Sequence, residues 1–152
     1  IRDNIRDEIE KKAWNKSIKS FSQFYGSNSL DSSLLLMEQY GFIDSKDPKY
    51  ISTVKAIEKN LCYNGLLYRY KNEDDFGLPS SSFTICTFWF INSLYKIGEI
   101  EKSKKMFDQI IKYGNHLNLF SEDLDFESKR LLGNFPQAYS HLALIDAALN
   151  FN

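Results

Sequence analysis

Acidic side chains crowd one short stretch of the chain, "NLFSEDLDFESKRLLGNFPQAYSH" at positions 118–141. Glu122, Asp123, Asp125 and Glu127 lie within six positions there. A carboxylate held in a fixed pose beside apolar groups can take a proton from water as a general base. Glu122 directly follows Leu-Phe-Ser and is therefore a candidate, but most acidic loop residues are simply solvated. The spacing alone does not separate Glu122 from Asp123 or Asp125.

The segment "YRY" at positions 68–70 is a second candidate site. Arg69 offers several donors in a fixed geometry, and Tyr68 and Tyr70 could stack on the faces of a sugar. The same arginine could instead form an ordinary ion pair with one of the acids at 73–75. From these residues alone the ion pair is the favoured interpretation, and the sugar site stays open.

The last apolar pattern carries Gln137 and His141, four positions apart and therefore on one face of a helix. They could line a polar pocket, although a hydrogen-bonded core histidine and a helix-end amide are the favoured interpretation. Cys62 and Cys86 are too far apart for a metal motif, so we expect two buried thiols and no metal site. Neither a GxSxG nucleophile motif nor a glycine-rich phosphate loop occurs, and no cofactor is expected.

Composition narrows the class of protein further. The chain has 152 residues, of which 43% are hydrophobic and 15% aromatic, enough for one folded domain with a core. A formal net charge of −1 gives no support for a nucleic-acid partner. The longest uncharged run, 76–95, contains glycine, proline and three consecutive serines and is too polar for a membrane span. No signal peptide is visible, which leaves the location open and favours the cytoplasm.

Six segments have the periodicity or composition of helices, and these must position the candidate residues. They lie near positions 1–13, 30–41, 47–61, 80–98, 99–114 and 136–151. Exposed amphipathic segments roughly alternate with apolar ones, and Asp47 and Pro48 mark a helix start. Several connections exceed ten residues, whereas simple bundles have short ones. This organisation predicts an all-α fold over positions 1–152, an α/α toroid or part of one.

Four ordered blocks carry a resemblance to a known family: "YGSNSLDSSLLLM", "NGLLYRY", the block from "FTICTFWF" to "NLFSEDLD", and "LGNFPQAYSHLALIDAALN". From about Trp14 to Asn150 the chain resembles the C-terminal part of the prokaryotic glucoamylase-like enzymes of glycoside hydrolase family 15. That family also includes glucodextranases and trehalase-type enzymes. The resemblance implies an (α/α)6 barrel of twelve helices, of which this chain would supply about half.

The resemblance also implies an activity and roles for particular residues. Members of the family hydrolyse α-glucosidic bonds in α-glucans or trehalose, with inversion, using two carboxyl groups about 6.5–9.5 Å apart. The general base of the family falls on Glu122 in "LFSEDLD", and the substrate-binding arginine falls on Arg69. Tyr68 and Tyr70 would form walls of the sugar pocket, and Gln137 and His141 are further candidates for substrate binding.

Two departures from the family pattern carry expectations of their own. Ser80 and Ser81 stand where many relatives have a Glu-Gly pair. The family's general acid lies in a Trp-Glu motif upstream of the matched region, and Trp14 and Trp89 are followed by other residues. The chain alone is therefore expected to be inactive, with its acid on a missing N-terminal half of the same enzyme.

A half-barrel should expose an apolar face, covered by that missing half or by another copy of the chain. The alternative interpretation is a noncatalytic helical module, derived from the same fold, that binds carbohydrate or another protein.

Overall fold

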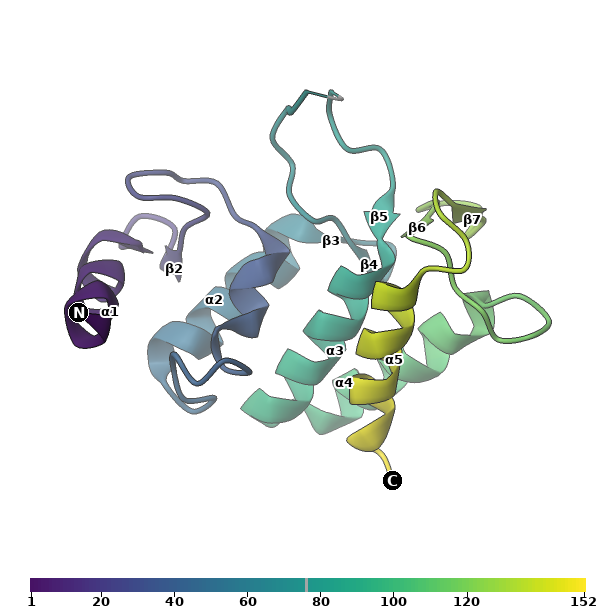
Figure 1. Ribbon diagram of the computed structural model, residues 1–152. Coiled ribbons are helices and arrows are strands. Elements are labelled where there is room, and N and C mark those ends of the chain that lie inside the picture. Colours follow the sequence, from purple (N-terminus) through teal and green to yellow (C-terminus); the bar gives the residue numbers. More distant parts are fainter. Residues whose placement is uncertain (76) are drawn as a thin grey trace.

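The computed structural model describes residues 1–75 and 77–152 and is mainly helical (Figure 1). Its α-helices and 3₁₀ helices are α1 (Arg2–Lys12), η1 (Ser32–Met37), α2 (Pro48–Leu61), α3 (Thr84–Ile97), α4 (Ile100–Ile110), η2 (Ile111–Tyr113) and α5 (Ala138–Leu149). Two-residue strands make up the rest of the regular structure: β1 (Trp14–Asn15), β2 (Ser20–Phe21), β3 (Cys62–Tyr63), β4 (Leu66–Leu67), β5 (Ser82–Phe83), β6 (Asp123–Leu124) and β7 (Leu131–Leu132). The expectation of an all-α chain is therefore confirmed, with short strand pairs added at its edges.

Helix α3 is the centre of the fold. It packs against η1 on one side and α5 on the other, while α2 and α4 lie outside this row (Figure 1). The side chains of Phe88, Phe90 and Ile91 are fully buried, as expected for a helix enclosed by others. The predicted alternation of inner and outer segments thus corresponds to an inner row, η1–α3–α5, backed by outer helices.

Helix α2 begins where the sequence predicts. Asp47 accepts a hydrogen bond from the backbone N–H of Lys49 at 2.7 Å, and Pro48 occupies the first turn. Val54, Ile57 and Leu61 recur along one face and are buried. The cap satisfies a backbone donor that the helix cannot, and the apolar stripe fixes the face that turns inward.

The segment at 30–41 differs from its expectation as an α-helix. Only Ser32–Met37 is helical, and it is a 3₁₀ helix. The backbone N–H of Ser32 donates to the Arg69 carbonyl at 2.8 Å, and its hydroxyl donates to the Tyr68 carbonyl at 2.7 Å. Gly41, with a φ of +67°, ends the turn that follows. Hydrogen bonds hold the start of this segment to residues 68 and 69, and a turn ends it at Gly41. The short stretch between them forms a 3₁₀ helix, which is typical of such short pieces.

A three-stranded sheet, which the sequence reading missed, lies where α3 and α5 begin (Figure 1). Its central strand β6 pairs antiparallel with β5 and β7, so that Asp123 lies opposite both Phe83 and Leu132. This sheet joins the segment before α3 to the β6–β7 hairpin, about 40 positions further along the chain. It therefore places the acidic stretch beside the start of α3.

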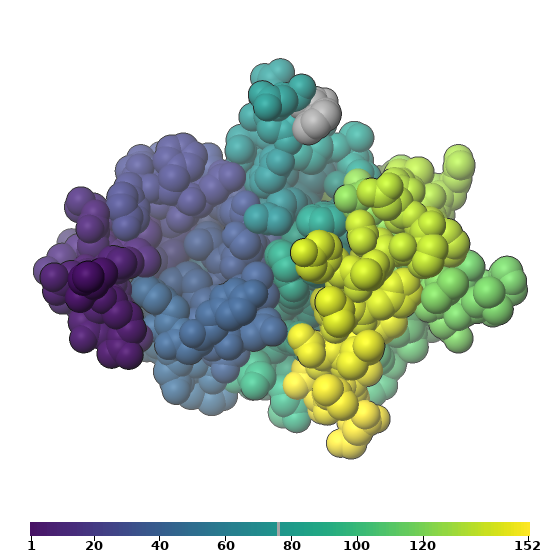
Figure 2. Space-filling model, in the orientation of Figure 1, coloured from purple at the N-terminus to yellow at the C-terminus, as the bar shows by residue number. Residues whose placement is uncertain are grey.

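Helix α5 presents an apolar face to solvent. Ala143 and Ala147 are buried, whereas Tyr139, Leu142, Ile145 and Leu149 are 56% to 65% exposed. In Figure 2 this helix, coloured yellow, lies at the surface of the molecule. This is the uncovered apolar face that half of a barrel should have. Among the described residues no helix is both long and apolar enough to cross a membrane.

Candidate active site

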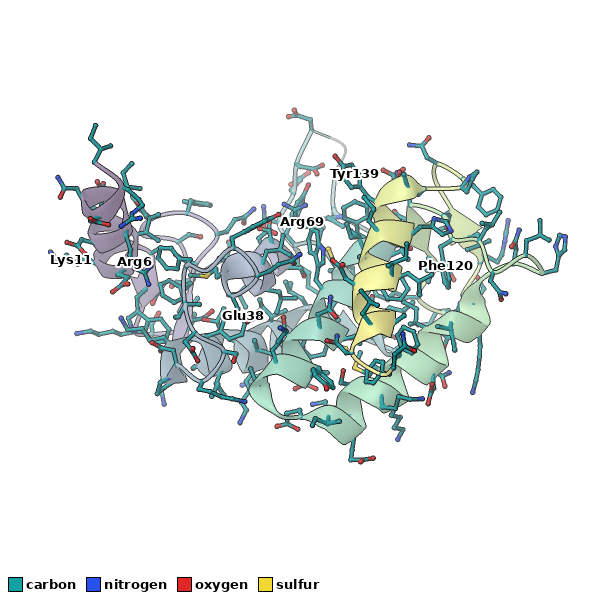
Figure 3. The ribbon with its side chains drawn as sticks, turned by 60° about the horizontal axis from the view of Figure 1, so that its bottom comes forward. Arg6, Lys11, Glu38, Arg69, Phe120 and Tyr139 are labelled. Atoms are coloured by element: carbon teal, nitrogen blue, oxygen red, sulfur yellow. The ribbon has the colours of Figure 1, made fainter. Side chains whose placement is uncertain are left out.

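A groove of about 640 Å³ lies at the end of the molecule where α3 begins. One wall is formed by Arg69, Tyr70, Asp74, Gly77–Ser81 and Phe83, and the other by Glu122 and Asp123. Arg69 and Tyr139, at the start of α5, lie toward this same end (Figure 3). The groove therefore brings together Glu122 and Arg69, the two residues that the family resemblance selects.

The carboxylate of Glu122 is held from one side. Its Oε2 accepts hydrogen bonds from the backbone N–H of Asn134 at 3.2 Å and from the Asn134 side-chain amide at 3.0 Å. Backbone bonds anchor the residue as well: its carbonyl accepts from the N–H of Thr84, and its N–H donates to the Asn134 carbonyl, each at 2.9 Å. In the described part of the chain both side-chain bonds end on Oε2. That leaves Oε1 for a water molecule.

Gly133 makes this close approach possible. Its φ is +71°, and a Cβ at this position would lie 2.9 Å from Oε2 of Glu122. A side chain here would both strain the backbone and displace the carboxylate. The glycine next to Asn134 is thus required for the pose of Glu122.

Arg69 has a partner that the sequence did not suggest. Its Nε donates to Oδ1 of Asp31 at 2.6 Å, and its guanidinium lies over the ring of Trp89 at 5.9 Å. The expected ordinary ion pair with an acid at 73–75 is not the one that forms. Instead, the hydroxyl of Tyr70 donates to Oδ2 of Asp74 at 2.5 Å, which raises the pKa of that tyrosine.

Asp123 is a second carboxyl group in the groove. Burial raises its pKa, and the nearby charge of Glu122 adds to this, while a hydrogen bond from the Ser81 hydroxyl at 2.5 Å opposes it. Ser80 and Ser81, where the sequence departs from the family pattern, both line the groove. The hydrogen bond from Ser81 thus links the first wall of the groove to strand β6, which begins directly after Glu122.

The raised pKa of Asp123 predicts a particular pH dependence of stability. A carboxyl group with a higher pKa in the folded protein stabilises the fold below its ordinary pKa of 3.8, and this contribution is lost as the pH rises through the folded value. We expect Asp123→Asn to flatten the loss of stability as the pH rises above 3.8 in urea unfolding.

Asp125→Asn is the matched control with the opposite sign. Hydrogen bonds from Ser128 lower the pKa of Asp125, so its contribution is present above the ordinary pKa and is lost as the pH falls. Parallel pH profiles for the wild type and Asp123→Asn would contradict the assignment of the raised pKa.

Three predicted substrate-binding residues are not among the described residues that line this groove. The ring of Tyr68 packs against Phe126, with centroids 4.1 Å apart. Gln137 precedes α5 and donates its backbone N–H to the Phe120 carbonyl at 2.9 Å. His141 accepts from the N–H of Phe120 at 3.2 Å, and its Nδ1 lies 2.7 Å from the Gln137 carbonyl. Both ring nitrogens thus serve backbone groups and support the loop that carries Glu122.

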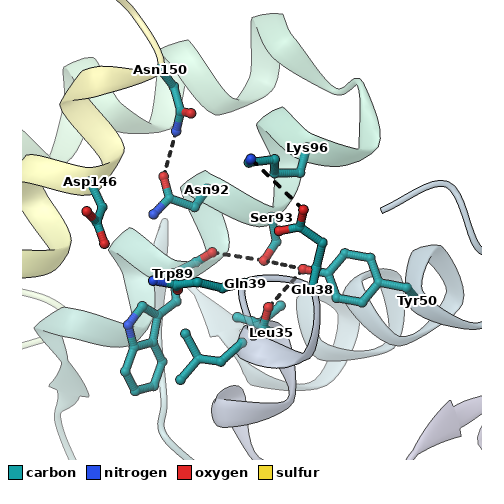
Figure 4. Close-up of a pocket in the computed structure, with 11 residues that line it drawn as sticks. Leu35, Glu38, Gln39, Tyr50, Trp89, Asn92, Ser93, Lys96, Asp146 and Asn150 are labelled. Carbon is teal, nitrogen blue, oxygen red and sulfur yellow. Dashed lines mark hydrogen bonds and ion pairs between the residues drawn. The ribbon is translucent and has the colours of Figure 1, made fainter. Parts of the chain in front are cut away.

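A smaller cavity of about 290 Å³ lies between η1, α3 and α5 (Figure 4). Several of its polar groups pair with one another: Tyr50 donates to the Leu35 carbonyl at 2.8 Å, and Glu38 lies 4.0 Å from Lys96. Burial raises the pKa of Tyr50 to about 12, so its hydroxyl stays neutral. These are structural contacts, and the groove at Glu122 is the better candidate for chemistry.

The described residues contain no cluster of His, Cys, Asp or Glu that could hold a metal ion. Cys86 is fully buried and Cys62 is partly buried, and burial raises the pKa of both thiols. They are free thiols, as predicted.

A family model and several curated proteins match nearly the whole chain. The family model described as glycosyl hydrolases family 15 matches residues 1–149. A trehalase of Thermoplasma volcanium is 38% identical over 149 residues, which cover 97% of this chain and 24% of the relative. A trehalase of Mycobacterium tuberculosis is 40% identical over 152 residues, which cover 96% of this chain and 22% of the relative. The chain thus spans about a quarter of the length of these relatives.

Solved structures share the fold. One titled "Glycosidase Wild Type" superposes with a TM-score of 0.82 at 16% identity, covering 97% of this chain and 42% of the other. A variant glycosidase in complex with glucose superposes equally well. The fold is therefore the partial helical barrel that the sequence predicts, about half of an (α/α)6 barrel. By its sequence, the chain belongs to glycosyl hydrolases family 15.

Proposed function

We propose that this chain is the C-terminal part of an inverting glycosidase that hydrolyses trehalose, with Glu122 as its general base. The observation that supports this most directly is the single groove lined by both Glu122 and Arg69. A carboxylate that can activate water and an arginine that can donate hydrogen bonds to hydroxyl groups together suit a sugar substrate. The relatives named as trehalases favour trehalose over α-glucans as that substrate.

In the proposed reaction Glu122 works through a water molecule. Its free Oε1 takes a proton from the water while the water oxygen attacks the anomeric carbon of one glucose unit. The bond from that carbon to the glycosidic oxygen breaks, and the oxygen leaves with a proton from a general acid on the opposite side. The bonds from Asn134 to Oε2 hold the carboxylate in one pose during the transfer. This positioning is what general-base catalysis requires.

Arg69 would bind the sugar. Its Nε is occupied by Asp31, so its two Nη groups are the donors that remain for hydroxyl oxygens in the groove. Ser80 and Ser81 add hydroxyl groups to the same wall. Tyr70 also lines the groove and remains a candidate to contact the sugar. Sugar contact by Tyr68, Gln137 or His141 stays a prediction.

We propose that the general acid lies on a segment of the longer protein that precedes this chain. Relatives roughly four times as long have room for that segment. The exposed apolar face of α5, formed by Tyr139, Leu142, Ile145 and Leu149, is the surface that it would cover. The chain alone is therefore expected to lack turnover.

The deciding experiment follows the anomeric form of the products. Attack with inversion on α,α-linked trehalose releases one β-glucose and one α-glucose, so early proton spectra should show them in equal amounts. Retention would give only α-glucose at first. The longer protein should release both anomers from trehalose faster than it cleaves malto- or isomalto-oligosaccharides, and residues 1–152 alone should release none. A longer protein that cleaves no α-glucoside would favour the noncatalytic interpretation.

A further inference from the structure

We propose that Asp31 is a positioning residue that fixes the guanidinium of Arg69 for substrate binding. This inference rests on the proposed function, because it explains how the sugar-binding arginine of that site is held. Asp31 does not line the groove, and it lies 38 positions before Arg69 in the sequence. Its role is therefore to act through Arg69.

The contact between the two residues is short and shielded. Oδ1 of Asp31 accepts from Nε of Arg69 at 2.6 Å, and Asp31 is only 7% exposed. The Arg69 side chain is 36% exposed, because its far end reaches the groove. A charge-assisted bond with one buried partner is stronger and better defined than a surface ion pair. The bond thus fixes the inner end of a side chain whose outer end meets solvent.

Neighbouring contacts restrict the arginine further. The ring of Trp89 lies below the guanidinium, with the carbon at its centre 5.9 Å from the ring centroid. Ser32, next to Asp31, holds the Tyr68 and Arg69 carbonyls by two hydrogen bonds. Backbone, Nε and guanidinium face are therefore each fixed by a different group.

This arrangement determines which donors face the substrate. Within residues 1–75 and 77–152, Asp31 is the one side chain that accepts from Arg69. With Nε bound to Asp31, the edge of the guanidinium between its two Nη groups still offers two parallel donors for adjacent hydroxyls. Asp31 also supplies the negative charge that balances Arg69 in this ion pair. Removing that charge should weaken substrate binding more than it slows proton transfer.

Asp31→Asn is the variant that isolates this effect. Asp31 also caps η1, since its Oδ1 accepts from the N–H of Ser33 at 2.7 Å, and an asparagine oxygen can keep that bond. In the longer protein we expect KM for trehalose to rise about 10- to 100-fold, with kcat changed only a few-fold. Asp47→Asn is the matched control, because Asp47 caps α2 in the same way and touches no groove residue in the described contacts. It should leave KM unchanged.

A second background shows whether Asp31 acts through Arg69. In an Arg69→Lys protein, adding Asp31→Asn should raise KM by less than about 3-fold, because lysine lacks the Nε donor. Calorimetric titration of trehalose into the Glu122→Gln protein should show the same 10- to 100-fold weakening when Asp31→Asn is added.

Unchanged KM and affinity in Asp31→Asn, while the wild type hydrolyses trehalose, would overturn this inference and leave the proposed function standing. An equal effect in the Arg69→Lys background would also overturn it. A wild type that neither binds nor hydrolyses trehalose would remove the proposed function and this inference with it.

Discussion

In the longer protein, Glu122→Gln is expected to lower kcat on trehalose by about 100- to 10,000-fold, the usual range for the loss of a general base. Glutamine has the same shape and can still accept the two hydrogen bonds that Asn134 donates to Oε2. It cannot take a proton from water at neutral pH. The fold and KM should therefore change little while turnover collapses, which steady-state rates and a thermal melt would measure.

Glu127→Gln is the matched control for this experiment. Glu127 lies five positions further along the same stretch and is exposed, with its carboxylate bound by Tyr63 and Asn64. It is not among the described residues that line the groove. Its turnover should stay within about 2-fold of the wild type, because solvated acidic groups contribute little. Full turnover in Glu122→Gln would remove Glu122 as the base.

The second large effect concerns the core below the groove. Phe88 is fully buried in α3 and packs edge-to-face on Phe120, with ring centroids 5.7 Å apart. Phe88→Ala should lower the free energy of unfolding by about 3–5 kcal/mol, because it removes buried apolar surface and leaves a cavity. Phe120 lies two positions before Glu122, so activity should fall as well, even below the melting temperature. Urea unfolding and trehalose turnover measure the two effects.

An exposed phenylalanine provides the comparison. Phe24 is 62% exposed, and Phe24→Ala should change the unfolding midpoint only slightly. If Phe88→Ala were no less stable than Phe24→Ala, the packing of α3 described above would be wrong.

The helices could be predicted largely from local signals. The Asp47 cap, Pro48 and the apolar stripe along 51–61 are read from neighbouring residues, and the structure confirms the cap, the proline and burial of the stripe from Val54 onward. The segment at 30–41 could not be read this way. Its helix is shortened by hydrogen bonds from Ser32 to carbonyls at 68 and 69, and local periodicity carries no information about such partners.

The candidate site was only partly predictable for the same physical reason. Glu122 and Arg69 were selected by resemblance, and the structure places both on one groove. Asp31 gives only a helix-cap signal in the sequence, and nothing local connects it with Arg69. The pairing of Asp123 with Ser81 depends on the β5–β6 register, and strands of two residues are too short for the sequence to predict that register. For His141 the favoured interpretation is a hydrogen-bonded histidine, and both of its ring nitrogens do contact backbone groups, while contact with a sugar stays a prediction.

Helix α3 has a consequence for how such a site can diversify. Thr84 binds the Glu122 carbonyl, Thr87 accepts from the Leu67 N–H at 3.0 Å, and Trp89 supports Arg69. Within six residues, one helix thus sets the spacing between Glu122, the proposed base, and Arg69. Tyr70, Asp74 and residues 77–81 shape the groove but do not set that spacing. Insertions there can alter which sugar fits while the reactive geometry is inherited intact, so substrate range and chemistry can evolve separately.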